Sequence, residues 1–288
     1  MHELRIGVCY DFRNPASSGV AHQTLYDEVI EQVRWLDRIG ADLVWFTEHH
    51  FVDDGYLPSW TPVAGAMAAV TERVRFGTDI CLMPFNHPVR LAEDLAVLDN
   101  LSGGRVELGV GMGYAPHEFR GFGLPVSRRV SLMNEGIEVL QRCFAGERFS
   151  YHGKRYQLDD VLITPGYVQQ GGPPLWIAAM SKAGALRAAQ YNTHFLPQGS
   201  KAQAFDPWVQ ALEADGEAYC LVGHSHGGSV ISAALLEAAQ RKEPLPGLKR
   251  WITVGTPFVR LRRESTLFLR LTLLQKAIFV ASLMLLLM

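Results

Sequence analysis

The sequence has little cysteine and no closely spaced cysteine pair. Its four cysteines, Cys9, Cys81, Cys143 and Cys220, lie far apart, which excludes a CxxC metal or redox motif. Scattered thiols of this kind predict a reduced, cytoplasmic protein rather than a disulfide-linked secreted one. The first residues, MHELRIGVCYDF, enter a strand pattern at once, so we expect no secretory signal.

An excess of charge of one sign is also lacking. The chain has 27 Lys and Arg against 29 Asp and Glu, a formal net charge of −2. No basic stripe with interleaved aromatic residues is present, so we expect no nucleic-acid partner. The adjacent His49 and His50 have no further ligands at metal-binding spacing, so the sequence predicts no metal site.

A long apolar run occurs only at the C-terminal end. Residues 267–288, LFLRLTLLQKAIFVASLMLLLM, are interrupted by Arg270, Gln275 and Lys276. The whole run reaches the roughly 20 residues that span a bilayer, but its two cations would each cost about 2.5–3.5 kcal/mol at the membrane centre. Three alternatives stay open: a membrane-associated segment, a buried last helix, or the cut end of something longer.

Strand and helix patterns alternate through the first two hundred residues. Strand patterns cover residues 4–10, 42–47, 74–83, 105–111, 174–180 and 193–198, and helical patterns include 25–39, 88–102 and 130–144. This alternation predicts parallel strands covered by helices. The fold is then either a (β/α)8 TIM barrel, which usually takes about 250 residues, or a doubly wound sheet. No GxGxxG follows the first strand, which favours the barrel.

Three stretches are close to a known family. They are DLVWFTEHHF (42–51), FGTDICLMPFNHPVRLAEDLAVLDNLSGGRVELGVGMGY (76–114) and GGPPLWIAAMS (171–181). From about residue 4 to 214 the chain resembles the bacterial luciferase-like flavin-dependent monooxygenases. The resemblance implies a (β/α)8 barrel, of which six β/α units are recognisable. It also implies that reduced FMN, or the deazaflavin F420 in some members, binds at the carboxyl ends of the strands.

An activity and partners are implied by the same resemblance. Members that use FMN oxidise a small organic substrate with reduced flavin and O₂, and most receive the reduced flavin from a separate reductase. Members that use F420 transfer a hydride instead. A homodimer is left open.

The motif TEHHF contains the candidate catalytic residue. An imidazole titrates near neutral pH, and one that follows the second strand lies at the barrel face where catalytic residues collect. Matching the motif to the family makes His49 the catalytic histidine and turns His50 into the structure. The alternative is a pair of hydrogen-bonded loop histidines. Glu48 suits either the orientation of a neighbouring side chain or a structural salt bridge.

Two strand ends are the expected neighbours of the flavin ring. The family has a bulge, often with a non-proline cis peptide bond, at the position of Thr78, Asp79 and Ile80. Gly111 and Met112 end the fourth strand, where glycine allows a backbone to come close to a flat ring. The luciferases themselves have arginine in place of Met112, which argues against light emission.

The expected phosphate site follows the fifth strand. Ser181 and Gly184 match the family's FMN phosphate site, at a helix start whose free amides suit an anion. The alternative is an ordinary N-capping serine. Arg105 is a weaker candidate, either for phosphate or for a structural role.

The segment after residue 217 has a different pattern. AYCLVGHSHGGSV, residues 218–230, is typical of a nucleophile elbow, and residues 218–259 resemble α/β-hydrolase lipases. Ser225 is therefore an alternative hydrolase nucleophile. In that fold the acid and the histidine follow the serine, but no aspartate occurs after Ser225 and no histidine after His226. A working serine hydrolase is not favoured.

The sequence thus predicts three parts. Residues 1–215 form an incomplete luciferase-like flavin-binding barrel, 216–263 an α/β-hydrolase-like β-α-β fragment, and 264–288 an apolar C-terminal helix. Residues 218–223 and 250–255 can take the seventh and eighth strand positions. A non-catalytic product that joins two families remains an alternative.

Overall fold

The computed structural model describes residues 5–198, 219–224 and 248–254. Its strands are β1 (Arg5–Tyr10), β2 (Leu43–Phe46), β3 (Arg75–Thr78), β4 (Cys81–Leu82), β5 (Leu108–Gly111), β6 (Phe149–His152), β7 (Gln157–Val161), β8 (Leu175–Ala179), β9 (His194–Pro197), β10 (Tyr219–His224) and β11 (Leu248–Val254). Its α-helices are α1 (His22–Ile39), α2 (Thr61–Ala68), α3 (Pro88–Ser102), α4 (Pro116–Gly121), α5 (Arg129–Phe144) and α6 (Lys182–Gln190). Short 3-10 turns are η1 (Ala16–Ser18), η2 (Met83–Phe85) and η3 (Val126–Arg128).

Parallel strands form two sheets that continue one another. One sheet has the order β10-β11-β1-β2-β3 and the other the order β4-β5-β8-β9. A parallel bridge between Phe76 and Val106 joins β3 to the chain just before β5, and β9 lies beside β10. With β3 and β4 as one interrupted strand, this order is that of a (β/α)8-type barrel.

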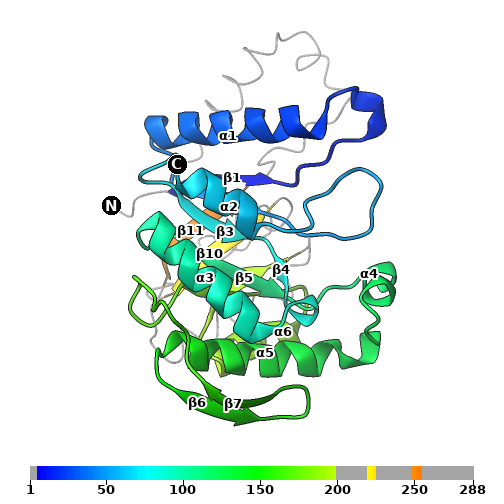
Figure 1. Ribbon diagram of the computed structural model, residues 1–288, viewed down its shortest axis with the longest axis vertical. Coiled ribbons are helices and arrows are strands. Elements are labelled where there is room, and N and C mark those ends of the chain that lie inside the picture. Colours follow the sequence, from blue (N-terminus) through cyan, green and yellow to red (C-terminus); the bar gives the residue numbers. More distant parts are fainter. Residues whose placement is uncertain (1–4, 199–218, 225–247, 255–288) are drawn as a thin grey trace, which may run out of the picture.

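The helices cover the outside of these strands. Figure 1 shows α1, α2, α3 and α5 following one another along one side of the molecule, and each packs against the next in this order. Gly40 ends α1 with φ 90° and Gly103 ends α3 with φ 66°, a left-handed conformation that glycine adopts without steric cost. These ends match the boundaries predicted from the sequence.

β2 is buried on both of its faces. Leu43 and Trp45 belong to a small cluster that also contains Trp176, while Val44 and Phe46 belong to the large core cluster. Successive side chains of a strand point to opposite faces. The small cluster therefore fills the inside of the ring of strands, and the large one fills the space between strands and helices.

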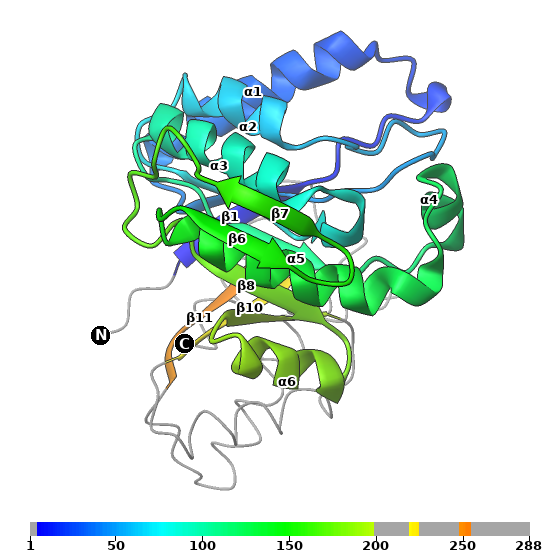
Figure 2. The same ribbon diagram turned by 60° about the horizontal axis from the view of Figure 1, so that its bottom comes forward.

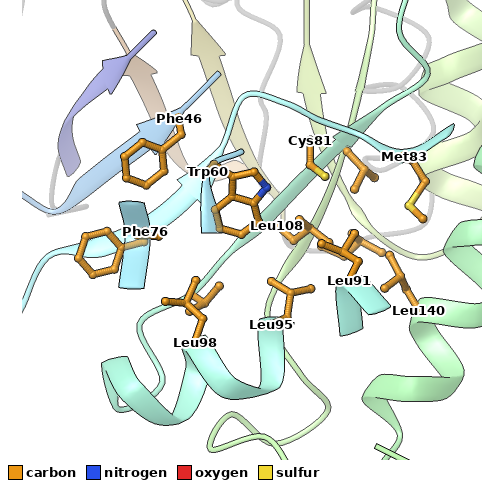
Figure 3. Packing of buried hydrophobic residues seen from close by; sticks show 14 of the residues in the cluster. Phe46, Trp60, Phe76, Cys81, Met83, Leu91, Leu95, Leu98, Leu108 and Leu140 are labelled. Carbon is orange, nitrogen blue, oxygen red and sulfur yellow. The ribbon is translucent and has the colours of Figure 1, made fainter. Parts of the chain in front are cut away.

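The large core cluster joins strands to helices. Figure 3 shows Phe46 and Phe76 from the strands beside Trp60, and Leu91 and Leu95 from α3 in the same cluster. Burying a side chain of this size stabilises the fold by about 1.5–3 kcal/mol. This packing holds α3 against the strands whose carboxyl ends carry the candidate site.

The third strand differs from its prediction. The sequence predicts one strand over residues 74–83, but β3 ends at Thr78 and β4 begins at Cys81. A cis peptide bond joins Asp79 and Ile80 between them. The resemblance to the flavin enzymes predicts a bulge at this position, whereas the hydrophobic pattern alone does not.

A hairpin between α5 and β8 was not predicted. β6 and β7 pair antiparallel outside the barrel and lie beside α5 in Figure 2. The hydroxyl of Tyr151 donates to Glu138 of α5 at 2.7 Å, and the amide of Arg155 donates to Glu135 of α5 at 2.7 Å. β6 and β7 are only four and five residues long, and strands this short give a weak periodic signal in the sequence.

The last two described strands extend the sheet beyond β1. β11 runs parallel to β1, with Ile252 opposite Arg5, and parallel to β10, with Ile252 opposite Val222. Ser225, the apolar run 267–288 and most of the expected β-α-β fragment lie outside the described residues. Of the helices that are described, none is long and apolar enough to cross a membrane.

Candidate active site

The loop after β2 carries both adjacent histidines. β2 ends at Phe46, and the backbone amide of His49 donates to the carbonyl of Leu57 at 3.2 Å. Because the strands of the ring are parallel, this loop lies at their carboxyl ends. Barrel enzymes have their catalytic residues at that end.

His49 is held by a carboxylate from a distant part of the chain. Its Nδ1 lies 2.8 Å from Oε1 of Glu118 in α4. The Glu118 side chain is fully buried, whereas 24% of the His49 side chain is exposed. The imidazole therefore combines a fixed partner with access to solvent, which suits a group that moves protons.

His50 forms a second pair with a carboxylate. Its Nε2 lies 3.0 Å from Oε1 of Glu48, and its side chain is 12% exposed. The ring stands edge-on to Phe122, with 4.8 Å between centroids. This contact fits both roles that the sequence allows for Glu48, the orientation of a neighbouring side chain and a structural salt bridge.

Two tyrosines flank His49. The rings of Tyr56 and Tyr114 stand edge-on to the imidazole, with centroids 4.8 and 5.8 Å away. Tyr114 is 65% exposed. Burial raises the pKa of Tyr56 to about 12, so its phenol stays neutral at physiological pH. The guanidinium of Arg13 lies 4.8 Å from the centroid of the Tyr56 ring, so the histidine edge of the site combines aromatic rings with charged groups.

The break between β3 and β4 is tied to both neighbouring strands. The Thr78 hydroxyl donates to the carbonyl of Gly109 at 2.7 Å and accepts from the Gly109 amide at 3.1 Å. The amide of Asp79 donates to the carbonyl of Phe46 at 2.8 Å. Ile80 packs against the cluster inside the ring of strands. The bulge is thus fixed between β2 and β5.

Glycine is required where β5 passes this bulge. A Cβ on Gly109 would lie 2.1 Å from the carbonyl oxygen of Thr78, and one on Gly111 would lie 1.9 Å from Cδ1 of Ile80. Contacts this short do not occur between real atoms. At Gly109 the Thr78 backbone leaves room only for glycine, whereas at Gly111 a side chain would require the end of Ile80 to move. Met112 follows, half-buried against the large core cluster. Gly111 and Met112 therefore adjoin the bulge.

Ser181 caps the helix that follows β8. Its hydroxyl accepts from the amide of Gly184 at 3.3 Å, and its side chain is exposed. A Cβ on Gly184 would lie 2.0 Å from Cβ of Ala179, so glycine lets α6 begin close to β8. The first amides of a helix have no partner inside it. The capping serine of the alternative reading is present, together with a helix start that can receive an anion.

Gln198 connects the bulge to the strand before Ser181. Its side-chain amide donates to Oδ1 of Asp79, and its backbone amide donates to the carbonyl of Ala179 at 2.9 Å. Ala179 ends β8, and Ser181 caps the next helix. The bulge and the α6 start are therefore linked by the residue that directly follows β9.

Arg105 belongs to the opposite end of the barrel. The N–H groups of its guanidinium donate to the carbonyls of Ser102, Val74, Ala68 and Thr71 and to the Thr71 hydroxyl, at 2.6–3.0 Å. It precedes β5, whereas the candidate site follows the strand ends. Of the two roles left open for Arg105, the structural one holds, because all its donors are used.

The predicted residues of the described part converge at one rim. Phe46 lies opposite Thr78, Leu82 opposite Gly111, and Val110 opposite Ile177 in the parallel register. The loops after these strands carry His49, the bulge and Ser181. Sequence reasoning missed Glu118 and Gln198, which lie 69 and 119 residues from their partners. No group of three His, Cys, Asp or Glu in the described residues is placed to hold a metal ion.

Comparisons with known proteins agree with this geometry. The luciferase-like monooxygenase family matches residues 4–266. The oxygenase component of the flavin-dependent trigonelline monooxygenase from Acinetobacter baylyi is 31% identical over 157 residues, 54% of this chain and 43% of that protein. The chain spans about half the length of the first curated relatives it matches.

Solved structures share the fold. Monooxygenase RslO1 from Streptomyces bottropensis superposes with a TM-score of 0.72 at 22% identity, covering 88% of this chain and 94% of that one. An FMN complex of the oxygenating constituent of 3,6-diketocamphane monooxygenase from Pseudomonas putida gives 0.64 at 17%, covering 77% and 67%. An F420-dependent secondary alcohol dehydrogenase gives 0.65 at 18%, covering 88% and 94%.

The family match also covers the C-terminal segment. It runs through residues 218–259, for which the sequence suggests a lipase-like origin. None of the relatives named above is a hydrolase, and β11 pairs with β1, as the eighth strand of a barrel does. The chain belongs to the luciferase-like monooxygenase family.

Proposed function

We propose that this chain is a flavin-dependent monooxygenase that uses reduced FMN and O₂ to oxidise a small organic substrate. The observation that carries this proposal is the gathering of His49, the Asp79–Ile80 bulge and the Ser181 turn at the carboxyl ends of adjoining parallel strands. Ligands of barrel enzymes bind at this end.

The residues present fit a flavin phosphate and a flat ring. Ser181, which is exposed, and the amides of Lys182 and Ala183 offer donors to a phosphate, whereas the amide of Gly184 is bound to Ser181. Thr78, Asp79 and Ile80 would support the ring from inside the barrel, and Gly111 and Met112 would border it. The side chain that Gly111 lacks would overlap Ile80, so this wall of the site is close-packed.

Each residue has a defined task in the proposed reaction. A bound reduced flavin supplies the electrons with which O₂ is activated. His49 moves a proton to or from an oxygen of the substrate, since its imidazole is partly exposed beside a buried carboxylate. Tyr56 and Tyr114 line the approach to His49, and their rings exclude water from one side of it.

The partners follow from the same proposal. The trigonelline relative is an oxygenase component, which supports a separate reductase that supplies reduced flavin to this chain. The expectations of a cytoplasmic protein and of a homodimer stay predictions. So does the division into a flavin-binding part over residues 1–215, a fragment over 216–263 and a C-terminal helix over 264–288.

Ser225 does not support a second function. It lies outside the described residues, and no histidine or aspartate follows the His226 beside it to complete a triad. The lipase-like origin of residues 218–259 remains a sequence-based hypothesis about the history of the chain. F420 is the one alternative cofactor, because an F420-dependent enzyme has the same fold.

Anaerobic titration of the purified protein with each reduced cofactor tests the proposal. We expect a saturable change in the absorbance or fluorescence of FMN at micromolar concentrations, and weaker binding of F420. With a reductase, NADH and O₂, the protein should then consume O₂ in the presence of a substrate. Tighter binding of F420 would replace monooxygenation by hydride transfer, and binding of neither cofactor would contradict the proposal.

A further inference from the structure

Glu118 is buried in the wall of the site and binds two groups of the histidine loop. Its side chain has no exposed area. Oε1 lies 2.8 Å from Nδ1 of His49 and accepts the backbone amide of His50 at 2.9 Å. A buried carboxylate is stabilised only by partners of this kind. The same oxygen therefore fixes both the imidazole of His49 and the backbone next to it.

The chemistry of these groups defines where the ring proton of His49 lies. Oε1 of Glu118 already accepts the backbone amide of His50, and as an acceptor it pairs with a hydrogen on Nδ1 of His49. In a neutral imidazole the other nitrogen, Nε2, then has the free lone pair. We propose that Glu118 is a positioning residue that holds His49 in this tautomer, so that Nε2 exchanges the proton with the substrate. The inference rests on the proposed function of His49.

α4 clamps the histidine loop from several directions. Beside Glu118, the ring of His117 binds the carbonyl of His50 through Nε2 at 3.1 Å. Phe51 occupies the space at Gly121, where a Cβ would lie 2.1 Å from its ring. Phe119 anchors the helix in the core without exposed area. Both backbone groups of His50 are thus bound to α4, and Glu118 cannot turn away without breaking this packing.

The pair of His50 and Glu48 supplies a matched control. It is also a buried carboxylate against an imidazole, at 3.0 Å, but it uses the opposite ring nitrogen, Nε2. Its two residues are close in sequence, and the ring packs against Phe122. Removing the Glu48 carboxylate therefore perturbs the same loop through the other histidine and leaves the contact between His49 and Glu118 in place.

Nitrogen NMR of histidine-labelled protein tests the tautomer directly. The ¹⁵N shifts of His49, assigned by their loss in His49→Asn, should show hydrogen on Nδ1 in the wild type above neutral pH. Glu118→Ala should move hydrogen to Nε2 in a substantial fraction of molecules. Glu118→Gln should keep it on Nδ1, because the His50 amide requires an oxygen at the Oε1 position and that oxygen still accepts from His49. A wild type with hydrogen on Nε2 would overturn the proposal.

Turnover gives the second readout. With FMN, reductase and a substrate, we expect kcat to fall about 10²-fold in Glu118→Ala, the usual scale for acid–base work, and less than tenfold in Glu118→Gln, with the affinity for FMN unchanged. Glu48→Ala should leave the His49 tautomer as it is and lower kcat less than threefold. A loss in Glu48→Ala as large as in Glu118→Ala would contradict the specific role.

Two features keep the outcomes distinct. If Glu118→Ala does not fold, Glu118→Asp, which is shorter by one methylene, replaces it, and its carboxylate should lose His49 with the same shift of hydrogen to Nε2. The NMR readout needs no flavin. A protein that shows the expected tautomers but binds no flavin would refute the proposed function and leave the positioning role intact. One that binds and turns over with His49 unchanged in Glu118→Ala would refute only the positioning role.

Discussion

The two ends of the barrel use polar residues in different ways. At the amino ends of the strands, every donor of Arg105 is bound, and the carboxylate of Asp37 accepts three backbone amides, of Glu72, Arg73 and Val74. At the carboxyl ends, His49 has one fixed partner and a partly exposed ring. Saturated networks hold the fold, and incompletely bound groups remain available for chemistry.

Arg105→Met should have the largest effect and should act on stability alone. It leaves five acceptors without their donor, several of them backbone carbonyls next to the core, which we expect to lower the free energy of unfolding by about 3 kcal/mol or more. Denaturant unfolding measures this. Arg148→Met, which removes an exposed ion pair with Asp160, should cost less than about 0.5 kcal/mol. Equal losses in both variants would refute the distinction between bound and exposed arginines.

His49→Ala should act mainly on turnover. We expect turnover to fall by about 10²-fold or more, close to 2.7 kcal/mol in the barrier, because the proton-transfer group is lost. FMN affinity should stay within about threefold, and stability should fall less than in Arg105→Met, because the buried Glu118 loses one partner but keeps the amide of His50. Steady-state kinetics with a reductase and differential scanning calorimetry check the two halves of this prediction. Unchanged turnover would remove His49 from the mechanism.

The position of His49 could be predicted from the sequence, whereas the role of Arg105 could not. The alternation of strands and helices and the TEHHF motif were enough to predict β2, α1 and the position of His49. Arg105 remained ambiguous, because its partners lie up to 37 residues away and a lone arginine in a turn has no pattern. Glu118 was missed for the same reason: α4, Pro116–Gly121, is too short for a helical periodicity.

The break in the third strand could not be predicted from the hydrophobic pattern either. An apolar run predicts a strand over residues 74–83, and only the family resemblance places a bulge at Asp79–Ile80. The β6–β7 hairpin has no such support, and its partly polar residues gave no signal. Pairings between distant residues are decided by packing, which a single sequence does not display.

Gly111→Ala should have an intermediate effect and should act on the cofactor. Its Cβ would lie 1.9 Å from Cδ1 of Ile80, so the Ile80 side chain must move into the space proposed for the flavin ring. Overpacking of this kind costs about 2 kcal/mol, and we expect FMN affinity to fall about thirtyfold. Fluorescence titration measures it.

Gly65→Ala is the control for added volume. A Cβ there would contact nothing within 4 Å, and alanine stabilises a helix by about 0.5–1 kcal/mol relative to glycine. It should leave FMN binding as it is. If both glycine variants bind FMN like the wild type, Ile80 does not adjoin the ring.

Ser181→Asp should have the smallest effect and the most selective one. Aspartate keeps the N-cap of α6 but places a negative charge beside the proposed phosphate. We expect FMN affinity to fall by about 1 kcal/mol, or fivefold, and riboflavin, which has no phosphate, to bind as before. A comparison of the two titrations decides the point. Equal losses for FMN and riboflavin would show that Ser181 does not contact the phosphate.

A crystal structure of the protein with FMN tests the central claim most directly. We expect one FMN molecule with its ring against Ile80 and within reach of His49, and its phosphate at Ser181 and the start of α6. A flavin bound elsewhere, or a ring that lies on the opposite side of β5 from His49, would contradict it.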